Sequence, residues 1–339
     1  MERHLQHRAE LALLSSQIDK QELRKFYFSV FSVLALLAII LPLAFQSPRK
    51  REWLPQKTDT ILSINTDQFE RADLPKRWGK DQPESWPKVW PGLIGAAAST
   101  PGLKLPRDAV RITRAIATDE SERTREFILL EARRDVTRAI RTIGDDKTFQ
   151  KRTISGLPVW ERPPNFAVAR VGPATLAVGT PDEVHELVLV RLGMKPDLKI
   201  SGQLFDRFQA LDRESALRLI SRDPPDLSRV FHPIFVPELL DASQLLGLAV
   251  TLQNPVKARL LLKMNTSKNA AELAHNLHDD PQRWLRLADS ELLLYSQPPE
   301  IQRQGDLNLE LRFTVPENSA RVLLERLAKT DAGTVITAY

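Results

Sequence analysis

The sequence has 339 residues, of which 42% are hydrophobic and 27% charged, a composition typical of globular rather than disordered proteins. It contains no cysteine, which excludes disulfides, thiolate catalysis and cysteine-ligated zinc. The net charge of +5 comes from 48 Lys and Arg against 43 Asp and Glu, mixed along the chain. Because no concentrated basic stripe is present, we expect no nucleic acid among its partners.

Residues 26–46 are predicted to form a transmembrane helix. The 20 residues from Phe26 to Phe45 carry no charge, and a helix of that length spans a hydrocarbon core of about 30 Å. A buried core helix is the alternative, but such helices rarely run this far without a polar face. A cleavable signal peptide is disfavoured, because the apolar run is too long and Ala44-Phe45-Gln46 lacks the small residues of a cleavage site.

The segment before this helix, residues 1–25, is predicted to be a helical tail, with Leu11, Leu14 and Ile18 on one stripe. It is either an extension of the anchor helix or a cytoplasmic partner helix. Basic residues nearly balance across the apolar segment, so their count does not fix the orientation. We expect the commoner arrangement, in which the short tail stays in the cytoplasm and the large soluble region is extracytoplasmic.

Residues 47–58 are predicted to be a proline-punctuated linker, and residues 59–200 a first α+β unit. Three tryptophans near its start form either a ligand or membrane platform or the cover of a core edge: Trp78, Trp86 and Trp90. Alternating and apolar runs predict strands over 60–64, 110–116, 127–132, 153–160, 166–171 and 174–179. Capping residues predict one helix from Asp135 to Gly144 and another from Thr180 to Gly193.

Residues 201–339 are predicted to form a second α+β unit, with strands over 245–252, 256–264, 291–295 and 307–315 and helices from Ser267 and Pro316. Helix starts lie 46 residues apart in the first unit and 50 in the second, so two ββαββα-like units are plausible. Clean alternation favours antiparallel sheets with helices on one face. The last strand should bury Leu307, Leu309, Leu311, Phe313 and Val315, and turn Asn308, Glu310, Arg312 and Thr314 toward water or a partner.

One segment resembles a known group of proteins. It runs from Gly156-Leu157-Pro158-Val159-Trp160 through Ala167-Val168-Ala169-Arg170 to Leu176-Ala177-Val178-Gly179-Thr180-Pro181-Asp182-Glu183-Val184. A strand, a hairpin with a small-residue turn and a Pro-acidic helix start in this order resemble uncharacterised bacterial single-pass membrane-anchored α+β proteins. The resemblance covers under a quarter of the chain, carries no catalytic signature and implies a similar build.

The candidate metal ligands are His275, His278 and Asp279, because residues three or four apart share a helix face. The alternative, which we favour, is that they are solvated residues near a helix end, so no metal or other cofactor is expected. His185 is expected to be a half-buried structural residue, and His232 lies in a proline-rich connection. No nucleophile-elbow, P-loop, dinucleotide-binding or zinc-protease motif is present.

The sequence therefore predicts a single-pass membrane protein whose soluble α+β region is noncatalytic and contacts another protein or the envelope, as an interaction or scaffold protein of the cell envelope. Its expected partners are the lipid bilayer and that second protein. The alternative is a membrane-tethered hydrolase with a scattered active site, which would require polar groups converging in one pocket with perturbed pKa values.

Overall fold

The computed structural model describes residues 53–81, 86–105, 107–118, 124–198, 203–227, 231 and 233–329. The predicted tail at 1–25, the predicted transmembrane helix at 26–46, residues 47–52 of the linker and His232 lie outside these ranges. Across the described residues, none of the helices has the length and apolarity that crossing a bilayer requires.

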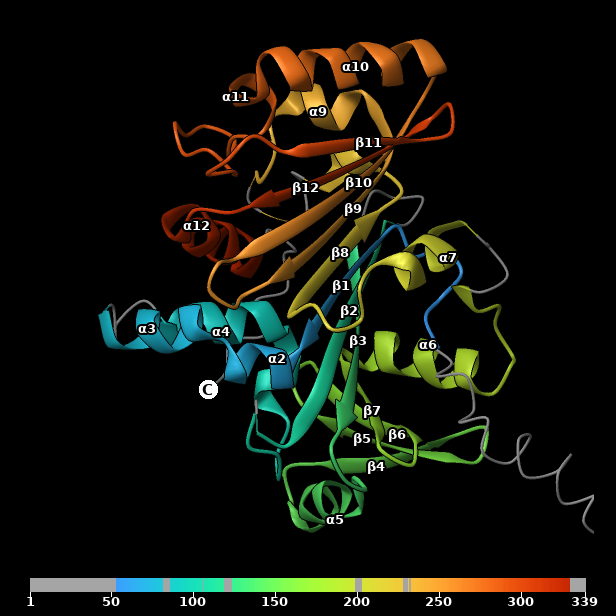
Figure 1. Ribbon diagram of the computed structural model, residues 1–339. Helices are drawn as coiled ribbons and strands as arrows, with labels where there is room; N and C mark the ends of the chain where they lie inside the picture. Colours follow the sequence, from blue (N-terminus) through green and yellow to red (C-terminus); the bar gives the residue numbers. More distant parts are fainter. Residues whose placement is uncertain are drawn as a thin grey trace, which may run out of the picture. The chain divides into compact units, whose positions relative to one another are not determined.

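A twelve-stranded antiparallel sheet organises the described chain (Figure 1). The strand order is β11-β12-β10-β9-β8-β1-β2-β3-β7-β6-β5-β4, and helices pack on the sheet, which confirms a mixed α+β fold with a large antiparallel sheet. The strands are β1 (Thr60–Asn65), β2 (Ala109–Thr118), β3 (Thr124–Ala132), β4 (Gln150–Ile154), β5 (Leu157–Arg162), β6 (Phe166–Gly172), β7 (Thr175–Gly179), β8 (Leu217–Ser221), β9 (Ser243–Thr251), β10 (Lys257–Met264), β11 (Glu300–Gln304) and β12 (Asn308–Thr314).

The longer helices follow the strands at the positions that capping residues predict. The helix α6, for example, begins after a capping box in which Thr180 and Glu183 satisfy each other's backbone N–H groups. The α-helices are α2 (Thr66–Arg71), α3 (Asp73–Asp81), α4 (Trp86–Ile94), α5 (Thr137–Asp145), α6 (Pro181–Arg191), α7 (Gln203–Ala210), α9 (Pro237–Asp241), α10 (Ser267–Asp279), α11 (Pro281–Trp284) and α12 (Glu317–Ala328). Two 3-10 turns, η1 (Gly95–Ser99) and η3 (Pro224–Asp226), complete the set.

The order of elements repeats along the chain. The first half runs β1-β2-β3-α5-β6-β7-α6, with the β4–β5 hairpin added at its outer edge, and the second runs β8-β9-β10-α10-β11-β12-α12. The halves meet where β1 pairs antiparallel with β8, with Thr60 opposite Ser221. Residues from both predicted units, 59–200 and 201–339, thus contribute to the same sheet.

The predicted linker over 47–58 ends earlier than its composition suggests. Leu54 is fully buried, and its carbonyl accepts a hydrogen bond of 2.8 Å from the Leu198 N–H. Pro55 forms an isolated bridge with Asp197. The contacts of Leu54 and Pro55 hold this short segment against the chain near Leu198. The folded unit therefore includes the chain from Trp53 onward.

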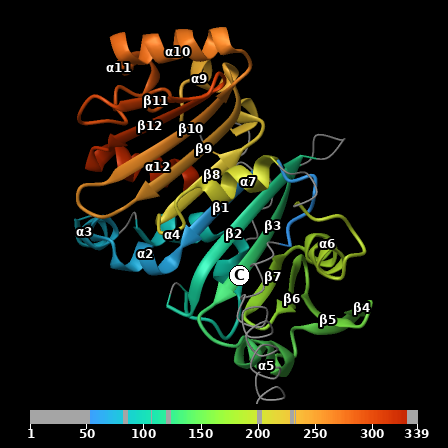
Figure 2. The same cartoon turned by 45° about the vertical axis from the view of Figure 1, so that its right-hand side comes forward.

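Helices lie on both faces of the sheet, so the prediction of helices on one face is wrong. Alternate residues of β3 enter different cores: Ile128 joins the larger core, beneath α3, α4, α5, α10 and α12, and Phe127 joins the smaller core, beneath α6 and α7 (Figure 2). The reason is visible in the run Phe127–Leu130, which is apolar at every position, as expected of a strand buried on both sides.

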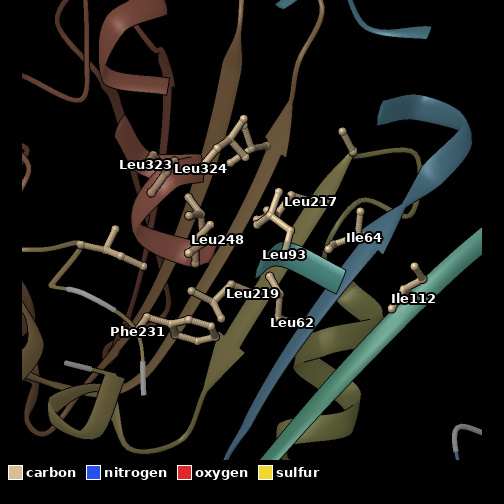
Figure 3. Packing of buried hydrophobic residues seen from close by; sticks show 14 of the residues in the cluster. Leu62, Ile64, Leu93, Ile112, Leu217, Leu219, Phe231, Leu248, Leu323 and Leu324 are labelled. Atoms are coloured by element: carbon tan, nitrogen blue, oxygen red, sulfur yellow. The ribbon is translucent and has the colours of Figure 1, made fainter. Parts of the chain in front are cut away.

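The larger core spans the junction between the halves. Figure 3 shows Leu62 of β1 and Leu219 of β8 close to Leu93 of α4 and Phe231. The side chain of Trp78, the one member of the predicted tryptophan cluster whose side chain is described, is fully buried in this core. It covers core surface, in line with the structural interpretation of that cluster.

A buried arginine ties α4 to the sheet. Arg114 of β2 is 1% exposed, its Nε pairs with Glu126, and its Nη1 donates to the carbonyls of Gly92 at 2.7 Å and Leu93 at 3.0 Å. These carbonyls belong to the last turn of α4, where no helical N–H is available to them. The guanidinium therefore closes the helix end and is itself neutralised by the carboxylate.

Two predicted strands differ from the structure, and the strands β8 and β11 were not predicted. The strand expected over 153–160 is a hairpin of β4 and β5, with Ser155 and Gly156 at positive φ, 47° and 88°, in the two-residue turn. No strand forms over 291–295, where Leu293 makes only an isolated bridge with Arg286. The edge strand β11 was not predicted, because its sequence Glu-Ile-Gln-Arg-Gln is short and polar.

Candidate functional site

The two halves differ in the helix that follows their last strand. In the first half, α6 packs on the smaller-core face through Val184, Leu187 and Val188. In the second half, α12 packs on the opposite face, where Leu323 and Leu327 join the larger core. Among the described helices, none therefore lies over β10, β12 and β11 on the smaller-core face, and α7 only borders it.

We call this surface the open face. It is polar where the equivalent surface of the first half is apolar, and its strands pair in register, with Arg259 opposite Arg312 and Gln302 opposite Glu310. Its polar side chains belong to Lys257, Arg259 and Lys263 of β10, Asn308, Glu310, Arg312 and Thr314 of β12, and Glu300, Gln302 and Gln304 of β11. Leu261 of β10, opposite Glu310, lies on the same face and is buried at the edge of the smaller core.

Glu310 lies at the centre of the open face and is only 1% exposed. Arg259 binds its carboxylate with two hydrogen bonds, Nε to Oε1 and Nη2 to Oε2, each of 2.9 Å. Arg312 donates from Nε to Oε1 at 2.7 Å, and the Gln304 amide donates to Oε2. We call these four residues the Glu310 cluster.

The cluster determines the ionisation of its carboxylate. Burial disfavours the charged form of Glu310, but the hydrogen bonds and positive charges of Arg259 and Arg312 outweigh this effect and lower its pKa. A carboxylate that is ionised at neutral pH and saturated with donors has no role as a general acid or base. The cluster is therefore suited to fixing the positions of two arginines, not to proton transfer.

A cavity of about 470 Å³ lies at one end of the open face, between the chain before β8 and the chain before β11. Arg259, Arg312, Lys257 and Glu300 contribute to its wall, as do Pro298 and Asp212. The cavity is shallow, and its wall combines charged and small polar groups with Ala249, Ala258, Pro298 and Phe313. This arrangement suits contact with a protein surface better than enclosure of a small apolar ligand.

The alternation in the last strand was predicted correctly in its apolar members and incorrectly in one polar member. Leu309, Leu311, Phe313 and Val315 are buried, and Leu307 is half-buried. Glu310, expected to face water or a partner, lies on the predicted face of the strand but is buried, because Arg259 from the neighbouring strand and Arg312 cover it. A single strand's pattern carries no information on a cross-strand neighbour 51 residues away.

The structure places the candidate metal ligands on the exposed surface of α10. His275 and Asp279 lie one turn apart, with Nε2 and Oδ2 separated by 3.3 Å, and their side chains are 73% and 57% exposed. His278 is exposed too. In the part of the chain that the structure describes, no group of three or more possible ligands comes together.

His185 is half-buried on α6, and its Nε2 lies 2.8 Å from Oε1 of Glu161 on β5. The neighbouring Glu183 is more deeply buried. Desolvation raises its pKa, against the hydrogen bonds it accepts from the Thr180 and Glu126 N–H groups. Both residues join α6 to the sheet, and the cavity beside the open face includes neither.

Comparison with known proteins gives little guidance. No family model matches the chain, and no curated protein matches it either. Distant structural similarity is found to crystal forms I, III and IV of TP0453, with 11–13% identity, TM-scores of 0.42–0.45, and coverage of 80–83% of this chain and 95–97% of that one.

Proposed function

We propose that this chain is a single-pass membrane-anchored, noncatalytic α+β protein that binds another protein through the open face. The supporting observation is that the second half leaves three strands uncovered by any described helix and fills that surface with a fixed ionic cluster. Arginines positioned by buried partners are frequent contributors to protein interfaces. The soluble unit is placed outside the cytoplasm in this proposal, as the usual topology of a signal anchor.

The anchor is supported by the uncharged run from Phe26 to Phe45. We expect the full chain to remain in membranes after carbonate and high-salt washing, and a chain lacking residues 26–45 to be released. Protease added to spheroplasts, in which the outer face of the cytoplasmic membrane is accessible, should digest the soluble unit. Recovery of the full chain in the wash would contradict the anchor, and protection from the external protease would contradict the orientation.

The open face can be tested with two matched arginines. Arg312 points to the open face, whereas Arg303 of β11 is exposed on the other face, next to Leu309. Partners cross-linked to the full chain in membranes should decrease at least several-fold with Arg312→Ala and remain unchanged with Arg303→Ala. Equal loss in both variants, or no loss in either, would contradict the assignment of the open face.

A further inference from the structure

A second cavity, of about 660 Å³, lies on the opposite face of the sheet, in the first half. It is enclosed by the end of α2, the chain from Gly102 to Asp108, the end of β3 and the first turn of α5. We call it the basic cavity, because six basic residues and only three carboxylates line it. The basic residues are Arg71, Lys104, Arg107, Arg133, Arg134 and Arg138, and the carboxylates are Glu70, Asp108 and Asp135.

Each of the three carboxylates is already engaged. Glu70 lies 3.3 Å from Arg133, and Asp108 lies 3.4 Å from Arg107. Asp135 pairs at 3.2 Å with Arg170, which is not part of the cavity wall, and accepts hydrogen bonds from Thr137. The pKa of Asp108 is lowered by the hydrogen bond from the Lys104 N–H, by the contact with Arg107 and also by the charge of Lys104, but three carboxylates still face six cations.

Four cations of the basic cavity form no ion pair with any residue that the structure describes: Arg71, Lys104, Arg134 and Arg138. They come from α2, the loop before β2, the end of β3 and α5, and all four are exposed. Like charges gathered in one cavity repel one another unless an anion compensates them. Their surplus points to an anionic ligand.

The wall of the basic cavity is fixed by contacts that do not use these four side chains. Asp108 accepts a hydrogen bond of 2.8 Å from the Lys104 N–H, and Arg133 donates to the Arg107 carbonyl at 2.6 Å. Gly102, at φ +75°, lies so close to α5 that a Cβ there would be 3.0 Å from the Cβ of Thr142. The loop is thus docked on the helix and presents its cations without rearrangement.

We propose that the basic cavity binds a phosphate group, either that of an anionic phospholipid or that of a soluble phosphate compound. Guanidinium groups match the oxygens of a phosphate in paired hydrogen bonds, and Lys104 adds a further positive charge. A lipid headgroup is the source that suits a membrane-anchored chain.

The test uses the full chain in neutral detergent at 0.15 M salt and three soluble probes. These are dihexanoyl phosphatidylglycerol, dihexanoyl phosphatidylcholine as the zwitterionic control, and inorganic phosphate. Titration calorimetry should show saturable binding of phosphatidylglycerol, with phosphatidylcholine at least tenfold weaker. Binding of inorganic phosphate with similar affinity would support the phosphate site and identify a soluble compound as its source.

Amino-acid substitutions test whether the probes bind in the basic cavity. The double variant Arg134→Gln/Arg138→Gln should weaken binding at least tenfold, and Lys104→Gln on the separate loop should weaken it several-fold. Arg141→Gln, an exposed arginine of α5 outside the cavity wall, should bind as the unaltered chain does. Unchanged melting temperatures without probe will show that the variants are folded. Absence of binding by both anions, or equal binding by the double variant, would overturn the proposal.

Discussion

Replacing Glu310 with glutamine tests whether the Glu310 cluster stabilises the fold. The substitution keeps the shape of the side chain and removes its charge, so the hydrogen bonds with Arg259 and Arg312 lose their ionic character. Hydrogen bonds to charged groups contribute about 1.5–3 kcal/mol each. Because the arginine side chains are 29% and 56% exposed and regain water in the variant, we expect a total loss of about 2 kcal/mol.

The lowered pKa of Glu310 also predicts how the effect of Glu310→Gln on the unfolding free energy changes with pH. The pKa of Glu310 is lowered in the folded state, so its stabilisation is complete above the unfolded value, near 4.3, and disappears as pH falls through the folded value. The difference in unfolding free energy between Glu310→Gln and the unaltered chain should therefore be constant from pH 7 to about pH 5. It should shrink below about pH 4.

Urea unfolding of the full chain in detergent, followed by tryptophan fluorescence, measures this difference. With an m-value of about 3 kcal/mol per M, the midpoint should fall by roughly 0.7 M at pH 7. Arg312→Ala serves as the control and should cost about 0.5 kcal/mol, because Arg259 still binds both carboxylate oxygens. A Glu310→Gln variant as stable as the unaltered chain at pH 7, or a difference that grows on acidification, would refute the reasoning.

Three further predictions concern packing and the surface. Phe313→Ala should cost about 3 kcal/mol in urea unfolding, since the ring is 7% exposed in the larger core, and a loss below about 1 kcal/mol would show that the register of β12 is wrong. Gly92→Ala should lower the melting temperature measurably, because a Cβ there would overlap the Ala328 carbonyl oxygen of α12, and a neutral effect would contradict this close contact. Replacing both His275 and His278 with alanine should leave the melting temperature unchanged with and without a chelator, whereas a chelator effect lost in the variant would indicate a metal site on α10.

Local patterns in the sequence were sufficient for much of the fold. Alternation identified β10 and β12, and the Thr180-Pro181-Asp182-Glu183 capping box identified the start of α6. The Ser155–Gly156 turn was missed, although a Ser-Gly pair inside an alternating run is a signal for a hairpin. The helices on the second face were missed because the continuous apolar run in β3 was treated as a strand buried on one side.

The Glu310 cluster and the basic cavity could not be predicted from the sequence, for a different reason. The Glu310 cluster combines residues from three strands, and the basic cavity combines Arg71, Lys104 and Arg134, which lie on three separate segments. Each of these residues taken singly has the sequence environment of an ordinary solvated charge. Only strand order and register bring them together, and these are properties of the whole sheet.

Because β1 pairs with β8, one edge of β1 stays unpaired during synthesis until β8 has been made. Thr60 and its partner Ser221 are 161 residues apart. At roughly 5–20 residues per second, β8 leaves the ribosome about 8–30 s after β1. During that interval the first half has β1 as an outer strand, with Ile61, Leu62 and Ile64 beside unpaired backbone groups. Nascent or truncated chains that end before β8 should therefore associate through this edge unless a chaperone shields it.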